Sequence, residues 1–296
     1  MQTRANLVLL LVSACWGAAF PSAKFALDAL DPSVFVVARF FLATILLLPF
    51  SWRALRDRRA LLGGFVLGSL DSGIYLLQCL GIDNMQASRC AFLAGFAVVF
   101  VPVLAFVLHR SPLGRRDALC IFMSMFGLYW LTDCSLTGLS FADAQVLASA
   151  AIFAFEVLYL QRVSVSCSAT ALVFYQILFT CVGATAHGMA TGNPLTLHWP
   201  GVSIMAALLF CVLVATVLAA NLQIRYQSRT SPLHAALIYS LQPVFAACAG
   251  ILVYDEQLTW QVAAGGGLIV LAGIIASATT VALPSNRRPL QPLAGA

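Results

Sequence analysis

Long apolar blocks recur along almost the whole chain, separated by short connections rich in charge or turn residues. A helix needs about 20 mostly apolar residues to cross a bilayer, and a sliding window of about 19 residues finds ten such blocks. The expected spans are residues 5–27, 32–50, 60–80, 86–108, 116–132, 142–161, 168–187, 199–221, 231–253 and 260–282. The pattern predicts an all-α membrane protein with ten transmembrane helices.

The composition argues against soluble classes of protein. Hydrophobic residues make up 61% of the sequence and charged residues 9%, whereas a soluble domain carries about 25% charged residues. The net charge of +5 does not indicate nucleic-acid binding, because the basic residues are spread between apolar blocks instead of gathering with aromatics on one face. Ten spans also leave no room for a separate catalytic domain.

Motifs that would indicate an enzyme are absent from the sequence. It contains no G-x-x-x-x-G-K-[ST] phosphate-binding loop, no H-E-x-x-H metal motif and no G-x-S-x-G nucleophile elbow. The nine cysteines show neither C-x-x-C nor zinc spacing, which favours a role as small hydrophobic residues. We therefore expect neither an enzyme, nor a cofactor, nor a metal site.

Lysine and arginine fall in alternate connections, and positively charged loops stay in the cytoplasm. Thirteen of the 16 basic residues lie at the N-terminus, in every second connection or in the tail: Arg4, Arg53, Arg56, Arg58, Arg59, Arg110, Arg115, Arg116, Arg162, Arg225, Arg229, Arg287 and Arg288. Both termini, including a tail at 283–296, are therefore expected to be cytoplasmic. Fifteen arginines against one lysine are typical of a GC-rich bacterial genome, so we expect the inner (plasma) membrane.

The sequence also contains a weak internal repeat. One offset aligns Trp16 with Phe153 and Arg39 with Gln176, and a slightly larger offset aligns Gln78 with Gln223 and Arg89 with His234. The matches keep their order, although apolar helices can also align by chance. Because five is an odd number, the second unit of five spans begins on the opposite side of the membrane and has the inverted orientation. Residues 5–132 and 142–282 are therefore predicted to form a 5+5 inverted-topology repeat.

Several stretches resemble the EamA family of the drug/metabolite transporter superfamily. The second half resembles it at Ser231–Ala246 (SPLHAALIYSLQPVFA), Glu256–Leu258, Gly265–Gly267 and Gly273, and the first half at Trp16–Gly17, Ala38–Phe40 and the start of the fourth span. One departure is the sequence His109–Leu113, where the family usually carries a glutamate near the leucine. Because the glutamate is missing in the first half, a functional role shared by this position in both halves is less well supported.

The resemblance implies a secondary transporter that works by alternating access. It further implies efflux of small metabolites, either amino acids or amphipathic drug-like compounds, from a cavity surrounded by spans one, three, four, six, eight and nine. The expected partners are a small-molecule substrate, membrane lipid and protons for coupling, and the chain is expected to be a monomer or a homodimer. One alternative is a passive exchanger of sugar phosphates or nucleotide sugars. Another is a structural membrane subunit, or a membrane enzyme, without flux of its own.

Ionisable groups within a span are costly, which makes them candidates for function. Asp71 lies midway along the third span, and Tyr75 and Gln78 follow at i+4 and i+7, on the same helical face. Such a polar stripe is typical of a helix that lines a wet cavity. The alternative is that Asp71 bonds a neighbouring helix and fixes its packing.

Glu156 is the corresponding candidate in the sixth span, with Tyr159 near the same face. Its carboxylate could bind a cationic group or take up a proton as the two sides open in turn. However, Arg162 follows six residues later, so Glu156 could also reach the membrane interface.

Arg39 in the second span stays charged at any relevant pH, and a pair with Asp71 on the next span would give both residues a structural or gating role. An arginine here is common in the resembled family, which favours architecture. The remaining cavity candidates are polar or aromatic residues of spans one, eight and nine: Trp16, Gln223 and Gln242.

Overall fold

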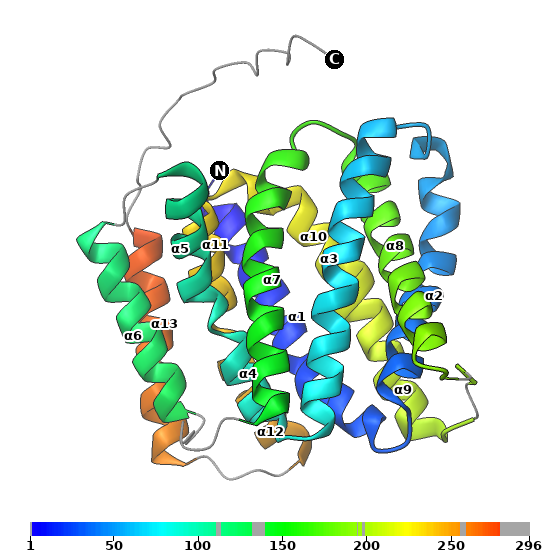
Figure 1. The fold of residues 1–296 in the computed structure, drawn as a ribbon. Coiled ribbons are helices and arrows are strands. Elements are labelled where there is room, and N and C mark those ends of the chain that lie inside the picture. The colour runs from blue at the N-terminus through cyan, green and yellow to red at the C-terminus, as the bar shows by residue number, and fades with distance from the viewer. Residues whose placement is uncertain are drawn as a thin grey trace.

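The structure is a computed structural model that describes residues 2–110, 114–131, 140–193, 195–196, 199–254 and 259–278. Within those residues all regular structure is helical, and the helices run side by side in one bundle (Figure 1). The elements are α1 (Gln2–Leu27), α2 (Pro32–Ser51), η1 (Trp52–Ala54), α3 (Arg58–Asp83), α4 (Ala87–Ala94), α5 (Ala97–His109), α6 (Arg115–Leu131), α7 (Phe141–Val163), α8 (Ala169–Ala190), α9 (Val202–Val212), η2 (Leu213–Leu218), α10 (Ala219–Tyr226), η3 (Gln227–Arg229), α11 (Pro232–Tyr239), α12 (Gln242–Tyr254) and α13 (Trp260–Ala278). The expected tail at 283–296 lies outside the described residues.

Among the described residues, eight helical segments are long and apolar enough to cross a membrane. The other two expected spans, 116–132 and 260–282, correspond to α6 and α13. Helix α6 has 17 residues, and the apolar part of α13, Ala263–Ile275, is shorter still. These two helices pack against each other at one edge of the bundle (Figure 1). The chain is thus a multi-pass helical membrane protein.

The expected spans 86–108 and 231–253 are each broken into two helices. The first consists of α4 and α5, and the second of α11 and α12. The offset that aligns Gln78 with Gln223 also carries both bounds of α4 onto those of α11, and both bounds of α5 onto those of α12. The second break directly precedes Pro243, whose ring favours the first turn of a new helix.

The expected span 199–221 is one continuous rod that changes its helical pitch. Between α9 and α10 lies η2, a π-helical turn in which the Thr216 hydroxyl donates to the Cys211 carbonyl, with Oγ1 2.9 Å from the oxygen. A π turn leaves carbonyl groups without their usual partners, and such turns are frequent at functional sites.

Helices α3 and α8 approach each other closely at a glycine. A Cβ at Gly68 would lie 2.5 Å from the Gln176 carbonyl oxygen and 2.6 Å from the Phe179 Cβ. Only a residue without a side chain fits there, as is common where helices pack within membranes. This contact brings Gln176 of α8 against the polar face of α3.

Connections that carry arginine gather at one end of the bundle, which also holds the start of α1 (Figure 1). We call it the arginine-rich end and define it by the connections 52–57 and 227–231, which contain arginine, and by 164–168, which follows Arg162 at the end of α7. There the Asp57 carboxylate accepts hydrogen bonds from the backbone N–H of Ser168 and from those of Arg59 and Ala60. These bonds, led by the one from Ser168, hold the pKa of Asp57 below its usual value. One carboxylate thus joins the starts of α3 and α8.

Candidate functional site

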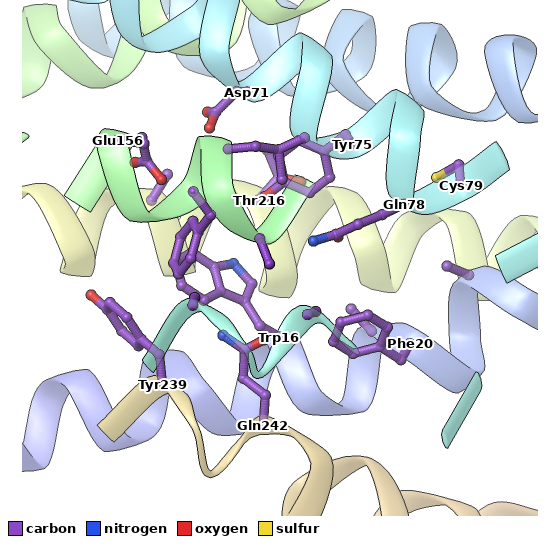
Figure 2. A pocket seen from close by; sticks show the side chains of 18 of the residues that line it. Trp16, Phe20, Asp71, Tyr75, Gln78, Cys79, Glu156, Thr216, Tyr239 and Gln242 are labelled. Carbon is purple, nitrogen blue, oxygen red and sulfur yellow. The ribbon is translucent and has the colours of Figure 1, made fainter. Parts of the chain in front are cut away.

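A pocket lies at the centre of the bundle, between helices from the first and second parts of the chain (Figure 2). Its lining includes eight of the nine residues singled out in the sequence: Trp16, Arg39, Asp71, Tyr75, Gln78, Glu156, Gln223 and Gln242. Tyr159 is not part of the lining; it stacks on the exposed Phe155, with ring centroids 6.5 Å apart. The periodicity that joins Asp71, Tyr75 and Gln78 thus describes one face of α3 that borders the pocket.

Asp71 is 8% exposed and is held by a residue from the other half of the chain. The Gln176 side-chain amide on α8 donates to it, with Nε2 2.7 Å from Oδ2. No other hydrogen bond to this carboxylate is found among the described residues, so its second oxygen is free. The close approach of α8 at Gly68, about one turn before Asp71, positions this donor.

Arg39, 3% exposed, does not bind Asp71 in the described structure. Its Nε donates to the Thr216 hydroxyl at 2.7 Å, and Nη2 donates to the Ala215 carbonyl at 3.2 Å. The guanidinium also lies over the Tyr75 ring, 4.7 Å from its centroid. The π turn thus supplies the acceptors of a buried cation. The pair with Asp71 that the sequence left open is not formed among the described residues, and Arg39 bonds to the eighth expected span instead.

Glu156 is 1% exposed and belongs to a chain of polar side chains. The Gln223 amide lies 3.4 Å from its Oε1, and the same amide nitrogen donates to Gln227 Oε1 at 3.2 Å. The Tyr239 hydroxyl donates to Gln227 at 2.9 Å. Glu156 therefore points into the bundle, which disagrees with the interpretation that it reaches the membrane interface.

Three aromatic rings lie together beside these polar groups. Trp16 contacts Phe153 edge-on, with centroids 5.8 Å apart, and Tyr239 lies 5.3 Å from Trp16 and 5.7 Å from Phe153. We call these three residues the aromatic trio. The Trp16 indole N–H is occupied, because it donates to the Ala215 carbonyl at 3.0 Å. The trio therefore presents ring faces and edges to the pocket.

The pocket extends toward the end of the bundle opposite to the arginine-rich end. Ala23, Ile82 and Cys90 belong to its lining and lie near the ends of α1, α3 and α4 on that side. Gln78 and Gln242 extend from α3 and α12 into it (Figure 2). Neither amide has a protein partner among the described residues, so both are available to a ligand.

On the side of the arginine-rich end, direct hydrogen bonds hold the helices together. Gln227 donates to the Val157 carbonyl at 2.9 Å, and Gln161 donates to the Thr230 carbonyl at 2.8 Å. A buried apolar cluster from α1, α7 and α11 fills the space between them. Hydrogen bonds and apolar packing therefore lie between the polar groups of the pocket and that end.

Two further cations, Arg89 and Lys24, form structural contacts at the end of the bundle opposite to the arginine-rich end. Arg89 forms an ion pair with Asp143, with Nε 2.6 Å from Oδ1 and Nη2 2.9 Å from Oδ2. Lys24 donates to the carbonyls of Ile82 and Asp83 at the end of α3, both at 3.0 Å, where a cation is favoured. Arg89 thus joins α4 to α7.

Several residues that complete this site did not emerge from the sequence. They are Phe153, Thr216, Gln227 and Tyr239, together with the role of Gln176 as partner of Asp71. The repeat offers a signal for some of them, because the two offsets align Thr216 with Asp71 and Phe153 with Trp16. Gln227 and Tyr239 have polar atoms in or next to apolar blocks, which is the same signal that singled out Gln223.

The described residues contain no group of three side chains that could hold a metal ion. The chemistry that the site offers is that of two carboxylates, one guanidinium, free amides and aromatic rings, all at the depth of the bundle centre. Such a set can bind a polar solute and move it or its protons between two sides of a membrane.

Comparison with known proteins identifies the family of the chain. The chain is 30% identical over 275 residues to an uncharacterized transporter of Archaeoglobus fulgidus, covering 92% of this chain and 85% of the relative. It shares its fold with a solved crystal structure at a TM-score of 0.74 and 14% identity, over 93% of this chain and 97% of the other. The sequence model of the EamA-like transporter family matches residues 3–132 and 140–278. The chain therefore belongs to the EamA-like transporter family and is a membrane transporter.

Proposed function

We propose that the protein is a secondary transporter that exports small metabolites, either amino acids or amphipathic drug-like compounds, by alternating access. The observation that carries this proposal is the central pocket, which holds buried polar groups and includes lining residues near one end of the bundle. A site of this kind, placed where two halves meet, is typical of transporters built from repeats. No separate energy-supplying domain is needed.

The proposed architecture has ten spans in a 5+5 inverted repeat. Its support comes from packing that occurs in matched pairs: α1 packs on α12 and α7 on α5, α3 packs on α8 and α2 on α9, and α6 packs on α13. If each helix is replaced by its counterpart in the other half, the contact between α1 and α12 becomes that between α7 and α5, and the contact between α3 and α8 becomes that between α9 and α2. The contact between α6 and α13 is converted into itself. The breaks after α4 and α11, which coincide when Gln78 is aligned with Gln223, support the same relation.

Span number and orientation can be tested by labelling single cysteines in a cysteine-free background. If α6 crosses the membrane, Gly114 and Ser140 lie on opposite sides, and Gly114 lies in the cytoplasm with the arginine-rich end. A membrane-impermeant maleimide added to intact cells should then label Ser140→Cys and leave Gly114→Cys unlabelled. Labelling of both positions would contradict a tenfold crossing. In the proposed orientation the pocket extends toward the outer face of the inner membrane.

We propose protons as the coupling ion, with Asp71 and Glu156 as carriers and Arg39 as a gating residue. A buried carboxylate changes its charge when it takes up a proton, which lets the halves rearrange at lower cost. The titratable and charged side chains that share the pocket with Glu156 are Arg39, Asp71, Tyr75, Cys79, Cys90 and Tyr239.

The alternative of a sugar-phosphate or nucleotide-sugar exchanger would need free cations in the pocket. Arg39 is bound to Thr216 and Ala215, and Arg89 and Lys24 are committed to contacts at the bundle end. These contacts support a substrate without phosphate over a phosphorylated one. A structural subunit that transports nothing would not explain why the pocket keeps two buried carboxylates, which are costly within a membrane.

Transport can be measured with the purified chain in proteoliposomes. The panel contains labelled phenylalanine, leucine, a quaternary ammonium dye and a sugar phosphate, each with and without an imposed pH gradient. We expect flux of a non-phosphorylated compound that depends on the gradient, and loss of this dependence in Asp71→Asn or Glu156→Gln. Asp83→Asn, which changes an exposed carboxyl at the end of α3, is the matched control. Flux only under counterflow with the sugar phosphate would contradict the proposal.

A further inference from the structure

The charges of the pocket do not balance. Asp71 and Glu156 bring two carboxylates and Arg39 brings one guanidinium, so one negative charge is left when both carboxylates are ionised. In the part of the chain that the structure describes, neither carboxylate forms an ion pair. A negative charge at this depth is costly without a partner. A bound cation would supply one.

Glu156 is the better placed of the two carboxylates to receive a cation. Asp71 accepts a short hydrogen bond from Gln176 at 2.7 Å, whereas Gln223 lies 3.4 Å from Glu156 Oε1. Oε2 of Glu156 accepts no hydrogen bond from the described residues. The carboxylate lies at the pocket side of α7 (Figure 2), next to the aromatic trio.

The aromatic trio fits the same kind of ligand. Ring faces attract cations through their quadrupole, and the three rings offer an apolar wall to the body of a ligand. Their polar atoms are occupied, because Trp16 donates to Ala215 and Tyr239 donates to Gln227. A carboxylate or phosphate on a ligand would find few donors on this wall.

Donors for an anionic head group are also scarce elsewhere in the pocket. Arg39 gives two of its five N–H groups to Thr216 and Ala215, and the Tyr75 ring covers one of its faces. The remaining donors among the described lining residues are then mainly the amides of Gln78 and Gln242 and the other N–H groups of the Arg39 guanidinium, which is only 3% exposed. Neutral amides bind an anion more weakly than a charged donor does.

We propose that the pocket binds organic monocations whose protonated amine contacts the Glu156 carboxylate and whose aromatic or apolar body lies against the aromatic trio. The inference rests on the proposed function, since it names the substrate class of the same site. It ranks amines without a carboxylate above amino acids, and both above phosphorylated compounds.

Four ligands with one phenyl body and different head groups test the ranking. They are phenethylamine as cation, 2-phenylethanol as neutral compound, phenylalanine as zwitterion and 3-phenylpropionate as anion. Binding is measured by calorimetry on the purified full chain in detergent. Because a charge-assisted hydrogen bond is stronger than a neutral one, we expect phenethylamine to bind at least about tenfold more tightly than each of the others. Equal or tighter binding of phenylalanine or 3-phenylpropionate would overturn the proposal.

Variants locate the amine contact. Glu156→Gln should weaken phenethylamine about tenfold or more and change 2-phenylethanol less than about twofold, since only the charged contact is lost. Phe153→Leu should weaken all four ligands, because it removes part of the wall. The control Asp83→Asn should leave all four unchanged. Unchanged amine binding in a folded Glu156→Gln protein would contradict the assignment, and the series on the unmodified chain decides the ranking if that variant does not fold.

Binding without flux separates this inference from the proposed function. If phenethylamine binds as expected but proteoliposomes show no flux of any compound, the transport proposal fails and the amine site stands. If a pH gradient drives amino acids while phenethylamine neither binds nor moves, the transport proposal stands and the amine site fails.

Discussion

Gln176 donates to the carboxylate of Asp71, with Nε2 2.7 Å from Oδ2, and this bond has a counterpart elsewhere in the molecule. The internal repeat aligns Arg39 with Gln176, and it aligns Asp71 with Thr216. Arg39 donates to Thr216 at 2.7 Å. A side-chain donor thus reaches an acceptor twice at aligned positions, once from α8 to α3 and once from α2 to η2. These two bonds tie the halves together at the level of the pocket.

Removal of the Gln176 amide should destabilise the protein because it leaves Asp71 buried without a donor. We expect Gln176→Leu to cost on the order of 1.5–3 kcal/mol, the range for a hydrogen bond to a charged group. The cost should fall when Asp71→Asn is already present, because the charge is then absent. The measurement is a double-mutant cycle on thermal unfolding in detergent, where about 2–4 °C corresponds to 1 kcal/mol.

Gln161 offers a matched control for this cycle. Its amide donates to the backbone carbonyl of Thr230 at 2.8 Å, so Gln161→Leu removes an amide donor from an uncharged acceptor. A loss of about 0.5–1.5 kcal/mol is expected there, with no dependence on Asp71→Asn. Equal coupling of both glutamines to Asp71 would show that the cycle reports general loosening of the bundle.

Much of the arrangement follows from periodicity and self-comparison of the sequence. The i, i+4, i+7 spacing identified the face of α3 that borders the pocket, and the repeat offset matches the two broken helices. The partners of the charged residues did not follow, because they lie on spans that are distant in the sequence and no local pattern indicates them. Asp71 meets α8, which reaches α3 through the contact at Gly68. The role of Thr216 as the acceptor for Arg39 was not predicted, because it depends on a π turn. No sequence pattern indicates such a turn.

The ion pair between Arg89 and Asp143 should restrict access to the pocket from the end of the bundle opposite to the arginine-rich end. Asp143 is 1% exposed and Arg89 27%, so Arg89→Gln leaves a buried carboxylate with only its Ser140 contacts. We expect a loss of about 1–3 kcal/mol, below the range for fully buried pairs because Arg89 is partly solvated. Cys90, which lines the pocket one residue away, should also react faster with N-ethylmaleimide, as measured by mass spectrometry.

Ser140→Ala is the control for this experiment. It removes the hydroxyl that caps α7 and contacts Asp143 but keeps the link between α4 and α7, and it should cost about 1 kcal/mol. The rate of Cys90 labelling should stay unchanged. If this substitution accelerated labelling as much as Arg89→Gln, the ion pair would have no specific effect on access.

Asp57 should make the stability of the protein depend on pH in the acidic range. The N–H groups of Ser168, Ala60 and Arg59 hold its pKa below the usual value in the folded chain. A carboxyl with a lower pKa when folded contributes stability above its unfolded pKa, about 3.9, and this contribution is lost as the pH falls through the folded pKa. The melting temperature should therefore fall between about pH 5 and pH 3, and fall less in Asp57→Asn. Parallel curves for both proteins would contradict this role.

Gly68 and Gly73 lie on the same helix and allow the packing of α3 on α8 to be tested directly. A Cβ at Gly68 would lie 2.5 Å from the backbone oxygen of Gln176, which cannot move without α8, whereas at Gly73 the nearest atom is the Ile152 Cδ1 at 3.6 Å. Gly68→Ala should therefore destabilise the protein by about 1–3 kcal/mol through overpacking. Gly73→Ala should be neutral or stabilise by up to about 1 kcal/mol, since alanine favours the helix. Because α8 carries Gln176, Gly68→Ala should also reduce the coupling between Gln176 and Asp71 in the double-mutant cycle. Similar melting temperatures for the two alanine variants would show that α8 can shift freely on α3, in which case the donor to Asp71 would not be fixed by this contact.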